Sequence, residues 1–550
     1  MTLRFALFAA TVALLPGPAH ADALIDNIDG MTLDADGKVV RFRAMTIANG
    51  KVTSLIAKRG DKPTVKVDYR IDFKGQTVLP GFVDAHGHVM DLGFRAMSLD
   101  LSDSRSLADA QERIRAYAAA NPNLRWIRGG GWNQEVWGLG RFPTAAELDV
   151  AVADRPVWLD RADGHAAWGN SAALKAAGIT AKSVSPAGGR IERSGANPSG
   201  VFVDAAQALV AKVIPEPIAL ERDVALRKAQ ELLLASGVTA VADMGTSGDD
   251  WLAYRRLGDV GGLRIRIMSY AGGLEVASRI AGPGPTPWLY GDRLRMGGVK
   301  LYADGALGSR GAWLKADYAD AAGQRGAGFL SNAQLKNIMS HAAMNNFQLA
   351  VHAIGDAANA EVLGAIDELS GTYTGDRRWR IEHAQIVDPA DLPRFAQHGT
   401  IASMQPVHQT SDRTMAEARL GPTRLAGAYA WAAMLRGGGR LAFGTDFPVE
   451  RPDPWAGWAA GFTRQDAAGE PYGGWQPQER LTREQAWKAY TVDAAYAGFA
   501  DDRFGRLAPG LAADFIVIDG SDPLLMSPSD LRKVKVLQTW VGGEKMFERK

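Results

Sequence analysis

Short apolar runs alternate with amphipathic stretches through most of this chain, and that alternation indicates its fold. A short apolar run is typical of a buried strand, whereas apolar positions three and four residues apart are typical of a helix. Strands that alternate with helices favour a parallel sheet closed as a (β/α)8 barrel of the TIM type. We count eight candidate strands, which are TVLPGFVDAH, GVTAVADMG, LRIRIMSY, LRMGGVKLYADG, FQLAVHAIGD, RWRIEHAQ, TIASMQPVH and LAFGTDFP.

The rhythm is interrupted once, between the first and the second of these strands. Residues 89–236 are far longer than a single connecting helix, so we expect a large insertion with αβ elements of its own. The segments RWIRGGGWN and RPVWLDRADGH read as strands within it. A register in which these two segments belong to the barrel is an alternative. The predicted barrel domain spans residues 77–500 and contains the insertion.

Both ends of the chain have a different pattern, in which apolar and polar residues alternate over short runs. In residues 22–76, Asn49-Gly50 predicts a hairpin turn between AMTIA and KVTSLIA. In residues 501–550, ADFIVID and VLQTWV read as strands. Two strand-rich ends around a long middle predict one small β-sandwich domain that is built from both ends of the chain.

The first residues have the pattern of an export signal. Arg4 precedes an apolar run from Phe5 to Leu15, and Ala19-His20-Ala21 fits an A-x-A cleavage site. We therefore expect residues 1–21 to be a signal peptide and the mature protein to be periplasmic or secreted. An uncleaved N-terminal anchor is the alternative. No later segment resembles a transmembrane helix, so we expect no membrane association beyond export.

Composition narrows the range of partners and cofactors. The chain has 62 Lys and Arg against 61 Asp and Glu, so it has no overall positive charge that would attract nucleic acid. It has no cysteine, which excludes disulfides and thiolate ligands. Any metal must be held by nitrogen and oxygen atoms. A small molecule is the partner we expect.

The candidate chemistry begins in PGFVDAHGH, where two histidines follow a predicted buried strand. Residues two apart on a strand project to the same face, so His86 and His88 can bring two imidazoles to one point. Functional side chains of such barrels lie at the carboxyl ends of the strands. Six metal-compatible groups fall on or near strand ends in this sequence: His86, His88, Lys300, His352, His383 and Asp446.

Each of these residues taken alone has a simpler explanation. His352 and His383 fit core histidines with satisfied hydrogen bonds, and Asp446 fits a turn or a helix cap. Lys300 taken alone fits a solvated or paired charge, although a lysine buried within GGVKLYADG needs a chemical reason. Independent structural roles would not all fall at the same edge of one barrel. The coincidence favours a shared metal site.

These motifs resemble those of the amidohydrolase superfamily. Within it, the chain is similar to the YtcJ-like metal-dependent hydrolases of the amidohydrolase 3 type, which include N-substituted formamide deformylases. The resemblance implies one or two divalent metal ions, with zinc expected, held by the six residues above. It also implies that Lys300 can be carbamylated and bridge two ions; an unmodified Lys300 favours a single ion. The motifs that carry the resemblance are PGFVDAHGH, WIRGGGWNQ, DGHAAWGNSAAL, VKLYADGALGSRGA, VHAIGDAAN, RIEHAQ, GTDFPVE and GRLAPGLAADFIVID.

The activity implied by this resemblance is hydrolysis of a non-peptide carbon–nitrogen bond, in an amide or a formamide-like substrate. Asp446 is the expected general acid and base, and His165 is the expected hydrogen-bond donor to the developing oxyanion. The same scaffold also suits esters, lactones or phosphotriesters, because an activated hydroxide does not select amides by itself. A periplasmic binding protein without catalysis is a further alternative.

Substrate contacts are expected from the insertion. We take Trp132, Asn133 and His165 as substrate-binding candidates, because aromatic and polar residues near a barrel mouth can line a pocket. The tryptophans of the insertion could equally form its own core, and His165 could form a structural pair with Asp163. His408 ends the seventh predicted strand and could reach the mouth. The resemblance leaves a homodimer open.

Overall fold

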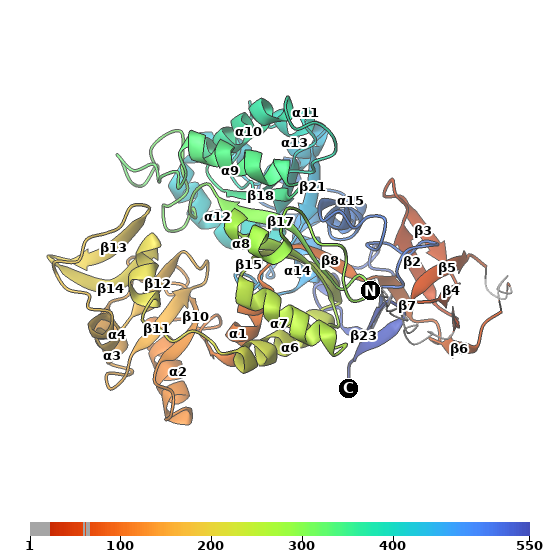
Figure 1. Ribbon diagram of the computed structural model, residues 1–550, viewed down its shortest axis with the longest axis horizontal. Coiled ribbons are helices and arrows are strands. Elements are labelled where there is room, and N and C mark those ends of the chain that lie inside the picture. The colour runs from red at the N-terminus through yellow and green to blue at the C-terminus, as the bar shows by residue number, and fades with distance from the viewer. Residues whose placement is uncertain (1–21, 59–60, 62–65) are drawn as a thin grey trace, which may run out of the picture.

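The computed structural model describes residues 22–58, 61 and 66–550, so the predicted signal peptide of residues 1–21 lies outside the described residues. Three parts follow one another along the long axis of the molecule (Figure 1). A barrel occupies the middle, a β-sandwich lies at one end and the insertion lies at the other. In the part of the chain that the structure describes, no helix has the length and apolarity that crossing a bilayer requires.

The barrel consists of eight strands in the order β21-β20-β19-β18-β17-β16-β15-β8, and every neighbouring pair is parallel. This confirms the predicted (β/α)8 fold. The strands are β8 (Phe82–Gly87), β15 (Val238–Thr246), β16 (Arg266–Gly272), β17 (Leu294–Tyr302), β18 (Gln348–Ala353), β19 (Arg380–His383), β20 (Ile401–Met404) and β21 (Arg440–Phe443).

Helices lie between and after the barrel strands, and the last one lies between two strands near the C-terminus. They are α6 (Ala219–Ala235), α7 (Gly248–Asp259), α8 (Leu274–Ala281), α9 (Asn332–Met344), α10 (Asp356–Ser370), α11 (Arg394–Gln397), α12 (Pro406–Leu420), α13 (Trp431–Arg436), α14 (Pro454–Thr463), α15 (Arg483–Ala489), α16 (Val492–Ala497) and α17 (Pro528–Leu531). Several begin with a side-chain cap; Ser247, for example, accepts a hydrogen bond from the backbone N–H of Asp250 at the start of α7.

The β-sandwich has two sheets, in the orders β5-β4-β1-β6 and β24-β23-β22-β7-β2-β3. The second sheet contains strands from both ends of the chain, since β22 pairs with β7. The predicted Asn49-Gly50 hairpin joins β4 and β5. The strands are β1 (Ala23–Asp26), β2 (Asp29–Leu33), β3 (Val39–Phe42), β4 (Ala44–Ala48), β5 (Lys51–Ile56), β6 (Tyr69–Asp72), β7 (Thr77–Pro80), β22 (Phe515–Ile518), β23 (Val536–Val541) and β24 (Glu544–Glu548).

One predicted strand is divided between the two domains. The run TVLPGFVDAH was expected to be a single barrel strand, but Thr77–Pro80 forms β7 of the sandwich and only Phe82–Gly87 enters the barrel as β8. The break falls at Gly81, where a Cβ atom would lie 2.2 Å from the side chain of Thr239. The chain changes sheets at a residue whose missing side chain allows close packing against the barrel.

The insertion contains its own six-stranded sheet, in the order β13-β14-β12-β11-β10-β9. The segments RWIRGGGWN and RPVWLDRADGH supply β10 and β11 of this sheet, so the alternative register that placed them in the barrel is wrong. The elements between β8 and α6 are α1 (Val89–Met97), β9 (Leu99–Asp100), α2 (Leu107–Ala120), β10 (Ile127–Trp132), α3 (Ala145–Asp149), β11 (Val157–Arg161), β12 (Ala166–Gly169), α4 (Ser171–Ala176), β13 (Gly189–Ser194), β14 (Asn197–Asp204) and α5 (Ala208–Ala211).

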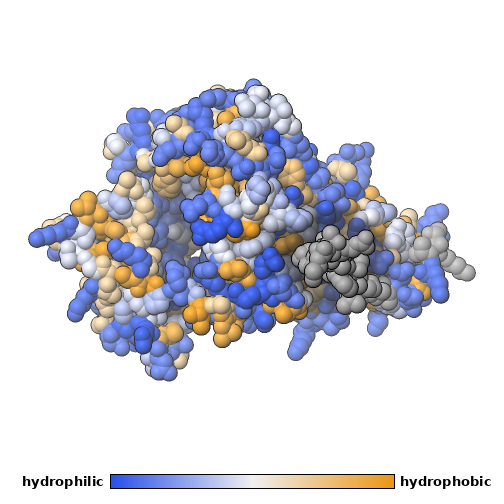
Figure 2. Space-filling model, in the orientation of Figure 1, coloured by the Kyte–Doolittle hydropathy of each residue, from blue (hydrophilic) through white to orange (hydrophobic). Residues whose placement is uncertain are grey.

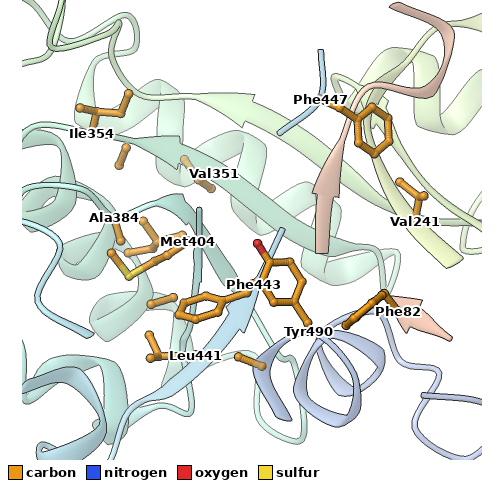
Figure 3. Packing of buried hydrophobic residues seen from close by; sticks show 14 of the residues in the cluster. Phe82, Val241, Val351, Ile354, Ala384, Met404, Leu441, Phe443, Phe447 and Tyr490 are labelled. Atoms are coloured by element: carbon orange, nitrogen blue, oxygen red, sulfur yellow. The ribbon is translucent and has the colours of Figure 1, made fainter. Parts of the chain in front are cut away.

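Aromatic residues pack where the first and last barrel strands meet the helices (Figure 3). Phe82 of β8 and Phe443 of β21 both lie edge-on to Tyr490, with ring centroids 6.3 and 5.6 Å apart. The Tyr490 hydroxyl also donates a hydrogen bond to the carbonyl oxygen of Gly444. This packing ties the two ends of the barrel sheet to one tyrosine.

The barrel closes between β8 and the segment that follows β21. The backbone N–H of Asp446 donates to the carbonyl of His86 at 2.8 Å, and the N–H of His88 donates to the carbonyl of Phe447 at 2.8 Å. A Cβ atom at Gly444 would lie only 2.5 Å from the backbone nitrogen of His86. The two segments can approach this closely only because residue 444 is a glycine. We call this contact the closing seam.

A methyl group at position 444 should therefore open the closing seam. We expect Gly444→Ala to lower the free energy of unfolding by roughly 1–3 kcal/mol, the usual range for overpacking a tight site. Gly248→Ala at the start of α7 is the matched control, because a Cβ atom there meets nothing within 4 Å. Urea unfolding of both variants measures the difference, and equal midpoints would contradict the close approach.

Candidate metal centre

His86 and His88 project from the end of β8 toward one carboxylate, as their spacing predicts. The Nε2 atom of His88 lies 3.2 Å from Asp446 Oδ1, and the Nε2 atom of His86 lies 3.5 Å from the same oxygen. The Nδ1 atom of His86 faces Glu382 Oε2 at 2.6 Å. A neutral imidazole that donates from Nδ1 keeps a free electron pair on Nε2, so His86 presents that electron pair toward Asp446.

Two further histidines lie beside this pair. The ring of His383 lies 4.7 Å from that of His86 and 4.6 Å from that of His352, measured between centroids. His383 Nδ1 donates to Gln405 Oε1 at 2.9 Å, which leaves its Nε2 as the electron-pair donor. His352 Nε2 faces the carbonyl of Gly305 at 3.5 Å, so its Nδ1 is the nitrogen left for a ligand.

Two site residues adopt a backbone conformation that side chains other than glycine seldom take. His383 has a φ of 73° and Asp446 a φ of 57°. Arg380 and Glu382 of β19 point into the barrel, so regular strand alternation would turn His383 outward. The left-handed backbone turns its side chain to the barrel mouth instead. Such conformations persist where the surrounding structure holds them, and they cluster at functional sites.

Lys300 lies among these imidazoles and is almost fully buried. Its Nζ atom is 3.2 Å from His86 Nε2 and 5.0 Å from the centre of the Tyr302 ring. Burial lowers the pKa of the Lys300 ammonium to about 8, although Glu382 and Asp446 partly oppose this effect. A lysine with this pKa is partly neutral in mildly alkaline solution.

Asp446 is the residue that the site histidines share. Burial raises the pKa of its carboxyl, but the charge of the neighbouring His88, whose own pKa Asp446 raises, outweighs that effect and holds the pKa below its usual range. Its Oδ1 atom is buried and makes no hydrogen bond. Burial keeps the pKa of His86, His352 and His383 well below that of free histidine, so these rings are neutral.

This donor set fits a divalent metal ion. Neutral imidazoles and an ionised carboxylate are the forms that bind metals, and the buried Asp446 oxygen without a partner is explained by a cation. Two groups of ligand atoms lie within 4.8 Å of one another: His86, His88 and Asp446, and also His383, His408 and Asp446. Lys300 and His352 border these groups.

A model of the amidohydrolase family matches residues 70–547 of this chain. The chain belongs to the amidohydrolase family. An amidohydrolase relative from Bacillus subtilis (strain 168), described as a putative amidohydrolase YtcJ, is 31% identical over 87% of this chain and 90% of its own length. An N-substituted formamide deformylase from Arthrobacter pascens is 27% identical over 96% of this chain and 98% of its own length.

Solved structures agree with the amidohydrolase assignment. The crystal structure of an uncharacterized metal-dependent hydrolase from Pyrococcus horikoshii superposes with a TM-score of 0.75 and 27% sequence identity. The match covers 92% of this chain and 99% of the other one. The chain is accordingly a metal-dependent hydrolase of the amidohydrolase superfamily.

His165 comes to the edge of this amidohydrolase metal centre. Its ring centroid lies 5.5 Å from that of His352. Its Nδ1 atom pairs with Asp204 Oδ1 at 2.8 Å, whereas Asp163 contacts only its backbone N–H. The ring partner is therefore Asp204 and not Asp163. Burial lowers the pKa of His165, but Asp204 and the neighbouring carboxylates outweigh burial and raise it overall.

Trp132 does not take the substrate-binding position that the sequence suggested. It is fully buried in the core of the insertion, and its indole N–H donates to the carbonyl of Leu159 at 2.7 Å. Trp137 and Trp168 pack against it, with ring centroids 6.3 and 6.1 Å from that of Trp132. An indole enclosed in this way has no free face for a ligand. The other explanation, that these tryptophans form the core of the insertion, is correct.

Asn133 is half-buried at the side of the insertion. Its Oδ1 atom accepts hydrogen bonds from the backbone N–H of Glu135 at 3.0 Å and from Arg161 at 3.3 Å. Both contacts hold the loop after β10. The structure brings His165 to the metal centre, but it shows Asn133 in this local role.

Sequence reasoning missed the buried pair Glu382 and Arg380. The guanidinium of Arg380 holds both carboxylate oxygens of Glu382, at 2.7 and 3.1 Å, and it also donates to the carbonyl of Ala85 at 2.5 Å. Glu382 in turn fixes His86. The signal was present in RIEHAQ, where two charged residues alternate along a strand that must be buried.

Replacing Glu382 should weaken metal binding, because Glu382 holds the ring of His86 and is not itself a proposed ligand. We expect Glu382→Gln to lower metal affinity about 10- to 100-fold, because a carboxylate that orients a histidine ligand typically contributes that much. Competition with a chelator measures the change. Glu368→Gln on the exposed face of α10 is the control and should leave affinity unchanged. Equal affinity in the two variants would show that Glu382 does not orient His86.

Proposed function

We propose that this amidohydrolase cleaves a non-peptide carbon–nitrogen bond in an amide or formamide-like small molecule. The observation that carries the proposal is the position of Asp446, a buried carboxylate beside four imidazoles with one oxygen that makes no hydrogen bond. A base in that position can take a proton from water and return it to a leaving group. The similarity to an N-substituted formamide deformylase supports the proposal that the bond cleaved is a carbon–nitrogen bond.

The metal ions would be held by His86, His88, His352, His383, Asp446 and Lys300. When bound, a divalent ion such as zinc lowers the pKa of water to about 7 and polarises the carbonyl group of the substrate. We propose that Lys300 contributes as a carbamate. Its neutral amine adds to carbon dioxide and releases one proton, which converts a cation into an anionic oxygen ligand. The lowered pKa and the buried position of Lys300 both support this reaction.

Asp446 is the proposed carrier of the proton. It takes a proton from water as the water oxygen bonds to the carbonyl carbon of the substrate. It then gives that proton to the nitrogen as the carbon–nitrogen bond breaks, so that a carboxylic acid and an amine leave. The pKa of Asp446 lies below its usual range, so the carboxylate is ionised at neutral pH and has no proton of its own before it takes one from water.

His165 is the proposed donor to the carbonyl oxygen. Its Nδ1–H is occupied by Asp204, so its Nε2 atom can donate only when the ring is protonated. The raised pKa of His165 favours that protonated form. A cationic donor beside the developing negative charge stabilises the transition state more strongly than a neutral one.

Removing the acid and base function of Asp446 should abolish turnover. We expect Asp446→Asn to lower kcat by at least about 10²-fold, because general acid and base catalysis contributes 10²–10⁴-fold in typical enzymes. Metal content should stay close to that of the unchanged protein, since an amide oxygen can still bind an ion. Asp502→Asn at an exposed position is the control. An unchanged rate in Asp446→Asn would eliminate this role.

Chelation and a substrate panel test the bond type. We expect N-formyl amines or N-acyl compounds to be hydrolysed, activity to disappear after chelation, and zinc or cobalt to restore it. Aryl esters, lactones and phosphotriesters belong in the same panel, because the scaffold suits them as the second possibility. Faster turnover of those compounds would replace the proposed substrate class. A protein that never binds metal would contradict the proposal as a whole.

A further inference from the structure

His408 is a buried histidine beside the metal centre that has no role in the mechanism above. It lies in the first turn of α12, directly after β20. Its Nε2 atom is buried, makes no hydrogen bond, and lies 3.7 Å from Asp446 Oδ2. Its ring is stacked on that of His383, with centroids 6.1 Å apart. A buried ring nitrogen that faces a carboxylate without bonding to it requires an explanation.

The other ring nitrogen of His408 shows which form of the imidazole is present. Nδ1 lies 3.2 Å from the Nε2 atom of Gln385, and the Oε1 atom of the same amide lies 3.3 Å from the hydroxyl of Tyr429. The hydroxyl has a single proton, which it donates to the carboxylate of Asp412 at 2.7 Å. The Tyr429 oxygen can then only accept, so Gln385 must turn its NH₂ group toward Tyr429.

This chain of hydrogen bonds fixes the direction of the amide. The two ends of an amide side chain are assigned from the hydrogen bonds around them. Only when the two ends of the Gln385 amide are exchanged, so that its oxygen faces His408, does the Tyr429 oxygen receive a hydrogen bond from it. The His408 Nδ1 atom must therefore be the one that carries the hydrogen, which it donates to Gln385. Its Nε2 atom is left with a free electron pair that points to Asp446. Asp412, Tyr429 and Gln385 thus prepare His408 as a ligand.

We propose that His408 binds the metal ion through Nε2 and that Asp446 is shared between two sets of ligands. One set joins Asp446 to His86 and His88, and the other joins it to His383 and His408, with the ligand atoms of each set within 4.8 Å of one another. This inference rests on the proposed metal-dependent function. It adds a ligand from the helix after the seventh barrel strand to the residues that the sequence motifs indicate.

Metal binding without substrate tests this assignment. The full-length protein and His408→Ala are loaded with Co²⁺, and metal content, the visible absorption of bound Co²⁺ and affinity against a chelator are measured. We expect His408→Ala to change the absorption spectrum and to lose at least tenfold in affinity or one ion per chain. His341→Ala on α9 is the control, because this histidine is exposed and lies outside both ligand sets.

A second variant leaves His408 in place. Tyr429→Phe removes the hydroxyl that orients Gln385, so the amide is free to turn and His408 Nε2 is no longer held as an electron-pair donor. We expect a severalfold loss of Co²⁺ affinity, measured in the same way. This variant decides the question if His408→Ala does not fold.

The possible outcomes distinguish failure of the proposed metal-dependent function from failure of the role assigned to His408. If neither the unchanged protein nor any variant binds Co²⁺, the proposed metal-dependent function fails. If the unchanged protein binds Co²⁺ and the spectrum and affinity stay the same in both variants, only the role of His408 is overturned. A change confined to KM, with Co²⁺ binding unaltered, would make His408 a substrate contact and would also overturn the proposal.

Discussion

The site depends on the close contact between the end of β8 and the segment after β21. That contact carries His86 and His88 on one side and Asp446 on the other, and backbone hydrogen bonds join the two sides directly. The Asp84 carboxylate strengthens it by accepting from the backbone N–H groups of His86 and Thr445. The candidate metal ligands are therefore positioned by main-chain closure of the barrel, before any ion contributes.

Around this contact, the candidate ligands are already in the protonation states that bind a metal ion. Burial keeps three of the histidines neutral, and the charge of His88 keeps Asp446 ionised. Arg380 and Glu382 provide a fully buried ion pair that holds His86 from below. Such a pair is costly to bury, and its retention makes sense where it sets the orientation of a ligand.

The barrel, and the meeting of the candidate site residues at its mouth, could be predicted because their signals are local. The i, i+2 spacing of His86 and His88 and the alternation of strands and helices need only neighbouring residues to be read. Long-range pairings gave no such signal: Glu382 with His86, and Asp204 with His165, join residues 296 and 39 positions apart. The prediction that Trp132 contacts substrate was made because composition alone does not distinguish the wall of a pocket from a hydrophobic core. The break at Gly81 was missed because β7 and β8 are both apolar and adjoin in sequence.

The short connection at Gly81 also bears on how the chain folds during synthesis. The strand that carries His86 continues directly from β7, and β7 is paired with β22, which begins at Phe515. The Gly81 N–H also donates to the carbonyl of Asp514 at 3.0 Å. The strand β7, which runs directly into the strand that carries His86, therefore gains its second neighbour from a segment that leaves the ribosome near the end of translation. Until that segment arrives, β7 has an open sheet edge next to the start of β8, which is a state that chaperones and proteases can recognise.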